Sequence, residues 1–189
     1  MSTLRVDNLN ARTGTSIAVP TGTKLYAPGH VIQIQQTTKT DAWTGSVSSG
    51  SATYATVTGL SVSITPTSTS SKILVMANLW IGFYVYSVRG VVRRDGTHLL
   101  VGNAASNRPR CSFWVSSHTG NTTYDGYHLH QVAFNYLDSP SSISTLTYDV
   151  GLASYSGYVA TLNRNYNWQD STEYDGAVAS SITVMEIAQ

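Results

Sequence analysis

The last strand-like segment of the chain, residues 180–188, constrains the fold more than any other stretch. It reads Ser-Ser-Ile-Thr-Val-Met-Glu-Ile-Ala, and successive side chains of a β-strand point to opposite faces. Ile182 and Val184 therefore point one way, and Met185 and Ile187 the other. A strand that is apolar on both faces has to be buried on both. The core of the domain covers one face, and we expect a neighbouring copy of the same chain to cover the other.

The composition favours one β-rich domain with a small appendage. The chain has 189 residues, of which 11% are charged, and its formal net charge is +1. It contains few Glu and Lys residues and many Ser, Thr, Val, Ile and Tyr residues, which favours strands over helices. The low charge argues against a nucleic-acid partner. The local basic cluster of Arg89, Arg93 and Arg94 has no aromatic residue between its members.

Cysteine content and hydropathy indicate the compartment. Cys111 is the only cysteine, so the chain cannot form an internal disulfide. The first eight residues are too polar for a signal peptide, and no apolar run reaches the length of about 18 residues that a membrane span needs. We therefore expect assembly in a reducing cytosol, with no membrane insertion.

Residues 1–28 differ from the rest and are predicted to form an extended N-terminal arm. Pro20 and Pro28 interrupt the segment, and its apolar residues are too few for an independent core. We expect the arm to dock on another protein or another copy. Its candidate anchoring residues are Leu4, Val6, Leu9, Ile17 and Val19.

From residue 29 to residue 189 the pattern is that of short strands separated by turns. Asp95-Gly96 stands between two such segments and is a strong signal for a two-residue hairpin. No window carries a helical period. The sequence predicts about nine or ten strands in an all-β, antiparallel β-sandwich, most simply a jelly roll. The predicted strands include residues 32–35, 60–64, 73–81, 88–94, 97–101, 127–134, 143–152, 158–162 and 182–187.

Several segments together resemble structural proteins of tailed bacteriophages, especially marine ones. The resemblance implies a virion component with a trimeric head similar to the jelly roll of tumour necrosis factor and C1q, anchored by its N-terminal leader to other virion proteins. The chain lacks the extended repeat shaft of a long tail fibre, which leaves a short tail fibre, a head fibre or a capsid decoration protein. The segments that carry the resemblance are residues 2–8, 19–24, 59–75, 93–97 and 136–140, Tyr148 and the terminal strand.

A homotrimer of this kind would bury the outer faces of the apolar strands. The candidate interface residues are Ile73, Val75, Ile182, Val184, Met185 and Ile187.

Two groups of residues could in principle hold a metal ion. His128 and His130 are spaced as in metal-binding jelly rolls, but the Glu that such sites place a few residues later is absent. Asp170, Glu173 and Asp175 could offer oxygen ligands to Ca²⁺, yet their spacing is also that of a solvated loop. We predict no metal and no cofactor.

No catalytic pattern is present, so we predict that the protein is not an enzyme. The sequence has no Gly-x-Ser-x-Gly elbow, no Gly-rich phosphate loop and no His-Glu-x-x-His motif. Cys111 lies close to Phe113 and Trp114, which is typical of a small buried residue rather than an activated thiol.

Late aromatic residues are the candidates for binding a host surface glycan. Tyr155, Tyr166 and Trp168 lie near Asn165, and aromatic faces beside amides can stack on sugars and bond their hydroxyl groups. The alternative is that these rings fill the rim of the sandwich or a subunit contact. The sequence thus leaves two function classes, a structural virion protein and a receptor-binding module, which one trimer can combine.

Overall fold

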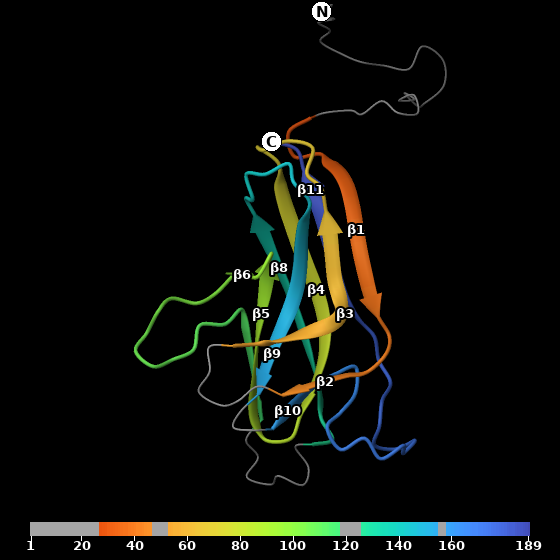
Figure 1. The fold of residues 1–189 in the computed structure, drawn as a ribbon. Helices are drawn as coiled ribbons and strands as arrows, with labels where there is room; N and C mark the ends of the chain where they lie inside the picture. The colour runs from red at the N-terminus through yellow and green to blue at the C-terminus, as the bar shows by residue number, and fades with distance from the viewer. Residues whose placement is uncertain (1–26, 47–52, 118–125, 155–157) are drawn as a thin grey trace, which may run out of the picture.

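The computed structural model describes residues 27–46, 53–117, 126–154 and 158–189, and these form eleven strands and no helix (Figure 1). Every strand pairing is antiparallel, which confirms the predicted all-β sandwich. The strands are β1 (Val31–Lys39), β2 (Trp43–Ser46), β3 (Ala55–Ile64), β4 (Lys72–Phe83), β5 (Tyr86–Arg94), β6 (Thr97–Leu99), β7 (Phe113–Ser117), β8 (Leu129–Asp138), β9 (Leu146–Ser154), β10 (Val159–Leu162) and β11 (Ser180–Ile187).

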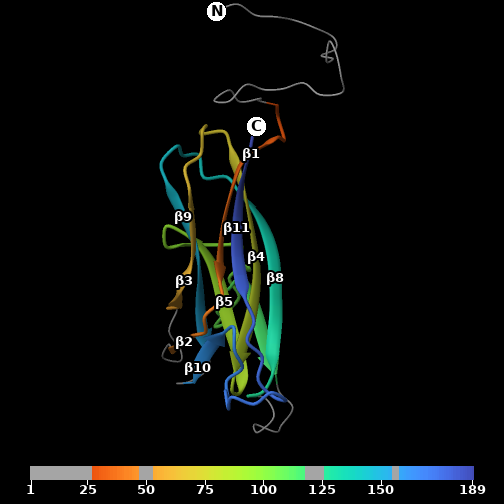
Figure 2. The ribbon, with the colours of Figure 1, turned by 90° about the vertical axis from the view of Figure 1, so that its right-hand side faces the viewer.

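The strands form two sheets that face each other as separate layers (Figure 2). Sheet A has the order β1-β11-β4-β10-β2, with β8 on the other edge of β4. Sheet B has the order β3-β9-β5-β6, and β7 also pairs with β5. The main strands lie in the orders β1-β11-β4-β8 in sheet A and β3-β9-β5-β7 in sheet B, which is the arrangement of a jelly roll.

The core lies between the two sheets and is built from alternate residues of their strands. From sheet A, β4 places residues 73, 75, 77, 79 and 81 in the core, and the residues between them are half-buried. Sheet B contributes Leu60, Val62 and Ile64 from β3 and Tyr148, Val150 and Leu152 from β9. All of these side chains are at most 6% exposed, so a single chain encloses a complete core.

The hairpin predicted at Asp95-Gly96 is confirmed. β5 and β6 pair in register on either side of it, with Arg94 opposite Thr97. Both turn residues have positive φ, 48° for Asp95 and 81° for Gly96, as the tightest hairpin turn requires. β2 and β7 were not predicted, because each is short and exists as a strand only through its pairing with β10 or β5.

The described chain begins and ends at the same end of the sandwich. The N–H of Gly29 donates to the carbonyl of Ala188 at 2.8 Å, and the N–H of Ala188 donates to the carbonyl of His30 at 2.9 Å. The predicted arm is attached at this end. Its candidate anchoring residues, Leu4, Val6, Leu9, Ile17 and Val19, lie outside the described residues.

Candidate functional site

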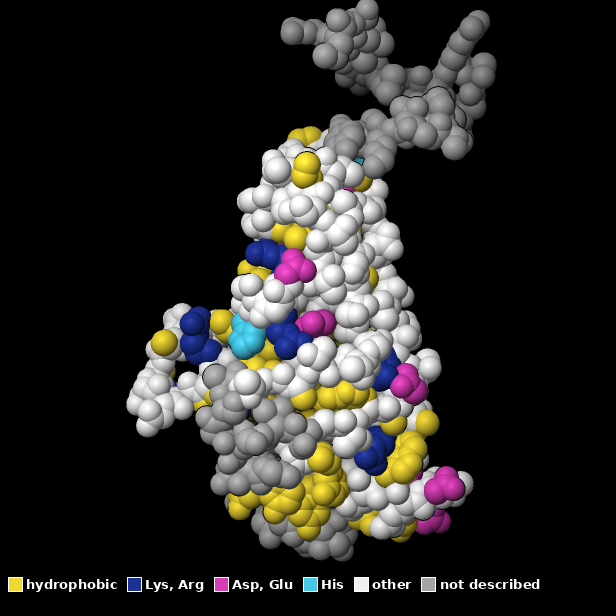
Figure 3. Space-filling view, in the orientation of Figure 1, with side chains coloured by type: hydrophobic (Ala, Val, Ile, Leu, Met, Phe, Trp, Pro, Cys, Tyr) yellow, Lys and Arg dark blue, Asp and Glu magenta, His cyan; other side chains and the backbone are white. Residues whose placement is uncertain are grey.

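The outer face of sheet A is almost free of charge. On the long strands β1, β11, β4 and β8, all of which are described, Lys72 is the one charged side chain that points outward. The surface of a soluble domain usually has about a quarter to a third charged residues of both signs. Figure 3 views sheet B, where Lys and Arg side chains lie beside Asp and Glu. The outer face of sheet A is therefore nearly uncharged, whereas the outer face of sheet B carries charges of both signs.

Four apolar side chains form one cross-strand row on this outer face. Ile34 of β1 lies opposite Met185 of β11, Met185 lies opposite Leu74 of β4, and Leu74 lies opposite Leu137 of β8. Residues directly opposite in neighbouring strands have Cβ atoms about 5 Å apart, so the row is continuous. The two end members, Ile34 and Leu137, are 54% and 48% exposed. In the single chain, the row therefore has a large exposed apolar side chain at each of its two ends.

The structure corrects four of the six predicted interface residues. Ile73, Val75, Ile182 and Val184 are 0% exposed within the single chain, because sheet B covers the inner faces of β4 and β11. They are core residues and cannot touch a second copy.

The other two predicted interface residues point outward. Met185 and Ile187 are half-buried and lie on the outer face of β11. The prediction that this strand is apolar on both faces therefore holds for Met185 on the outer face and for Ile182 and Val184 on the inner one.

Glu186 is a buried carboxylate that the sequence analysis did not single out. It is 0% exposed and accepts four hydrogen bonds, from Gln33 Nε2 at 2.6 Å, from Thr67 N and Thr67 Oγ1 at 2.7 Å each, and from Ser71 Oγ at 2.7 Å. Burial on its own raises the pKa of a carboxyl group, but these donors outweigh it and lower the pKa of Glu186. The carboxylate ties the β3–β4 connection to the terminal strand.

The predicted basic cluster is divided between the two faces of β5. Arg94 points inward and donates to Asp138 Oδ2 at 2.6 Å, and Tyr148 donates to the same oxygen at 2.8 Å. Arg93 points outward and pairs with Asp149 at 2.6 Å. The cluster is structural, since both of these arginines are held by carboxylates.

The candidate glycan-binding residues lie in or near the β10–β11 connection, and those that are described differ in exposure and packing. Trp168 is 43% exposed, and the guanidinium of Arg164 lies 5.6 Å from the centre of its ring. Tyr166 is half-buried and packs against Tyr84 with ring centres 4.9 Å apart. Tyr155 lies outside the described residues. Trp168 is thus the exposed aromatic member of the described set.

Asn165 is corrected from a ligand-binding residue to a structural one. It is 0% exposed, and its Nδ2 donates to the carbonyl of Tyr174 at 2.8 Å and to Asp175 Oδ1 at 2.7 Å. Its Oδ1 accepts the N–H of Trp168 at 3.0 Å. Both sides of the amide are therefore used to hold the loop that presents Trp168.

Asp175 accepts hydrogen bonds from the same loop. Its Oδ2 accepts the backbone N–H groups of Gln169 at 2.6 Å and Ser171 at 3.0 Å, and its Oδ1 is taken by Asn165. The hydrogen bond from the Ser171 backbone is the main cause that lowers the pKa of Asp175. Trp168, Asp170, Ser171, Thr172, Asp175 and Ala177 line a hollow of about 270 Å³ at this loop.

His130 of β8 and His128, which precedes the strand, have neighbouring rings, and His130 also lies beside an aromatic ring. The rings of His128 and His130 are 6.0 Å apart between centres, and His130 stacks on Phe83 at 5.1 Å. Over the described parts of the chain, no three His, Cys, Asp or Glu side chains gather as a metal site would require.

Cys111 is half-buried, and burial raises the pKa of its thiol. A raised pKa keeps the thiol protonated at neutral pH, where it is a poor nucleophile.

Across residues 27–46, 53–117, 126–154 and 158–189, the chain contains no helix with the length and hydropathy of a membrane span. No protein-family model and no curated protein matches the sequence.

Proposed function

We propose that the protein is a non-enzymatic structural component of a tailed-phage virion, in which three copies of the β-sandwich head pack through the outer face of sheet A. The observation that carries the proposal is the row of Ile34, Met185, Leu74 and Leu137 on a face with one charged side chain. Burying such a row releases water from apolar surface, with a gain of about 25 cal/mol per Å². No ion pair has to be desolvated on that face.

A closed three-fold assembly fits this surface. A closed ring satisfies every copy and leaves no apolar face open to further addition. The resemblance of residues 59–75 and of the terminal strand to trimeric fibre-like phage proteins supports three copies rather than two.

The arm supplies attachment in this proposal. Residues 1–28 join the head beside its C-terminus, where the N–H of Gly29 donates a hydrogen bond to the carbonyl of Ala188. Two of the residues in the apolar row, Ile34 and Met185, lie close in sequence to this end. The arm would therefore dock on other virion proteins while the head packs against its copies, as in a short fibre or a capsid decoration protein.

A second candidate function is recognition of a host surface glycan. It is favoured by Trp168, which is exposed beside Arg164 on the β10–β11 connection, at the end of the head opposite the C-terminus (Figure 1). Three copies would multiply a weak sugar affinity through avidity.

The virion assignment is tested by locating the chain in particles. An antibody against the head should label purified particles of the phage that encodes the chain, and deletion of residues 1–28 should abolish the label without unfolding the head. Particles that never carry the chain would contradict the proposal. Labelling that survives the deletion would place the attachment in the head instead of the arm.

A further inference from the structure

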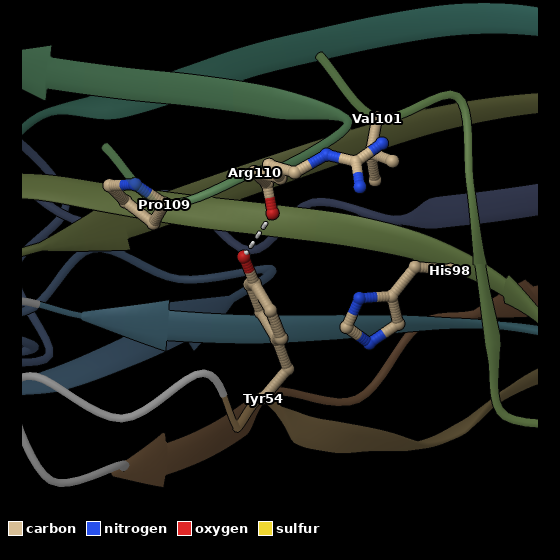
Figure 4. Close-up of a pocket in the computed structure, with 5 residues that line it drawn as sticks. All are labelled: Tyr54, His98, Val101, Pro109 and Arg110. Atoms are coloured by element: carbon tan, nitrogen blue, oxygen red, sulfur yellow. Dashed lines mark hydrogen bonds between the residues drawn. The ribbon is translucent and has the colours of Figure 1, made fainter. Parts of the chain in front are cut away.

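A cavity on the sheet B side of the molecule has no role in the packing described above. It lies where the β6–β7 connection, which projects from the side of the sandwich in Figure 1, returns to the sheet. Its volume is about 410 Å³, within the range of about 300–1,000 Å³ that small-molecule sites occupy. The lining residues are Tyr54, His98, Val101, Pro109 and Arg110 (Figure 4).

Among the described residues that line the cavity, Arg110 carries a guanidinium group and none carries a carboxylate. Arg110 donates through Nε to the carbonyl of Gly102 at 2.7 Å. Its two terminal nitrogens have no hydrogen-bond or ion-pair partner in the part of the chain that the structure describes. The guanidinium of Arg89 adds a second positive charge, 5.8 Å from the centre of the Tyr54 ring. The two open terminal nitrogens of Arg110 favour an anion, because Arg binds carboxylates through paired donors.

The same cavity is apolar along its other walls. The rings of Tyr54 and His98 stand nearly perpendicular, with centres 5.2 Å apart, and Val101 and Pro109 complete the lining. In Figure 4 the His98 ring and the Arg110 guanidinium lie on the same side of Tyr54. A bare inorganic anion would leave these apolar walls unused, whereas the C–H face of a sugar ring packs well on an aromatic side chain.

The cavity is already formed because its walls are tied together. Tyr54 donates its hydroxyl to the carbonyl of Arg110 at 2.9 Å, as the dashed line in Figure 4 shows. Ser112 fixes the returning end of the connection: its Oγ donates to the carbonyl of Leu99 at 2.8 Å and accepts the N–H of Val92 at 3.0 Å. A preformed site loses less entropy when a ligand binds.

We propose that this cavity binds a sugar residue that carries a carboxylate, with Arg110 on the carboxylate and the Tyr54 ring against the sugar. Two sources share this chemistry, the uronic acids and the nine-carbon sialic acids. The site is independent of subunit packing, because it lies outside sheet A, and its failure would leave the packing proposal untouched.

The test is a calorimetric titration of the full-length chain with glucuronic acid and with N-acetylneuraminic acid. The methyl ester of each sugar serves as a neutral control of nearly the same shape, and inorganic phosphate controls for charge alone. We expect at least one acid to bind, its ester to bind at least about ten-fold more weakly, and phosphate not to compete at the same concentration. The acid that binds more tightly identifies the source.

Variants separate the site from general surface charge. Arg110→Gln should weaken binding of the acid about ten-fold or more, and Arg110→Lys should restore part of it. Arg108→Gln removes the same charge from the same connection at a residue outside the lining and should change nothing. Tyr54→Phe keeps the ring and serves as a second probe, expected to bind more weakly than the native chain because the bond to Arg110 is lost. Absence of binding by both acids, equal binding of acid and ester, or equal effects of the Arg110 and Arg108 variants would overturn the proposal.

Discussion

Met185 of β11 lies directly opposite Leu74 of β4, in a register that puts both side chains on the outer face of sheet A. The next residue, Glu186, points to the inner face and is 0% exposed. The two faces of β11 therefore have different roles. Its inner residues close the core and tie down the β3–β4 connection, and its outer residues offer apolar surface to a partner.

Substitutions on the two faces of β11 should have different effects. Ile182→Ala removes a side chain that is 0% exposed and should lower the free energy of unfolding by about 2–5 kcal/mol. Met185→Ala, on the outer face, should leave the free energy of unfolding of a single, unassembled chain nearly unchanged. It should instead weaken the association of copies. Chemical denaturation at several protein concentrations checks this, because only the Met185 variant should change the concentration dependence. Equal losses from both variants at every concentration would contradict the division of faces.

Glu186 should make the head sensitive to acid. Since its pKa is lowered in the folded chain, its contribution to stability is complete above its ordinary value of 4.5 and is lost as the pH falls through the folded value. Glu186→Gln should flatten the dependence of the melting temperature on pH below about 4.5. The same substitution should lower the melting temperature at pH 7. Melting temperatures between pH 3 and pH 7 measure both effects, and parallel curves for the two proteins would exclude Glu186 as the cause.

Removing Asp138 should cost more stability than removing the Tyr148 hydroxyl group that bonds to it. It accepts from both Arg94 and Tyr148 and is 4% exposed, so Asp138→Ala leaves a largely buried charge and a buried hydroxyl group without an acceptor. We expect a loss of about 3–5 kcal/mol in unfolding free energy. Tyr148→Phe removes one hydrogen bond and should cost about 1 kcal/mol. Urea denaturation measures both, and a loss for Asp138→Ala no larger than for Tyr148→Phe would refute this view of the network.

Trp168 tests the glycan-binding candidate. Trp168→Ala should abolish adsorption to host cells while particles remain intact, because the exposed ring is lost but the loop is still held by Asn165 and Asp175. Trp114→Ala is a matched control, since this ring on β7 is 51% exposed. Adsorption that survives the Trp168 change, or fails equally with the Trp114 change, would speak against the loop as a receptor site.

Much of the fold could be predicted from local patterns. Period-two alternation marks β3, and a run that is apolar on both faces marks β4. Asp95-Gly96 specifies its hairpin through the positive φ of both residues. β2 has only the sequence Trp-Thr-Gly-Ser, and its strand character comes from pairing with β10, more than a hundred residues later. Such long-range pairing leaves no local signal.

The face assignments show a second limit. The alternation correctly separates Ile182 and Val184 from Met185, but it does not say which face the second sheet covers. The predicted interface therefore includes core residues. The same period puts Glu186 on the inner face with Ile182, and this parity was the available signal for a buried carboxylate. Its donors on Thr67 and Ser71 lie more than a hundred residues earlier. Asn165 was assigned to a binding surface for a similar reason, since a loop amide that braces its own loop has the same sequence appearance as one that meets a ligand.

The central claim, that the outer face of sheet A joins copies of the chain, is tested most directly by the mass in solution. Light scattering should give three chain masses for the native protein and one chain mass for Met185→Asp, whose circular dichroism should still show the intact sandwich. Ser61→Asp adds the same charge at an exposed position of β3 and should remain trimeric. A native protein that is monomeric, or a Met185→Asp variant that keeps the mass of three chains, would contradict the account.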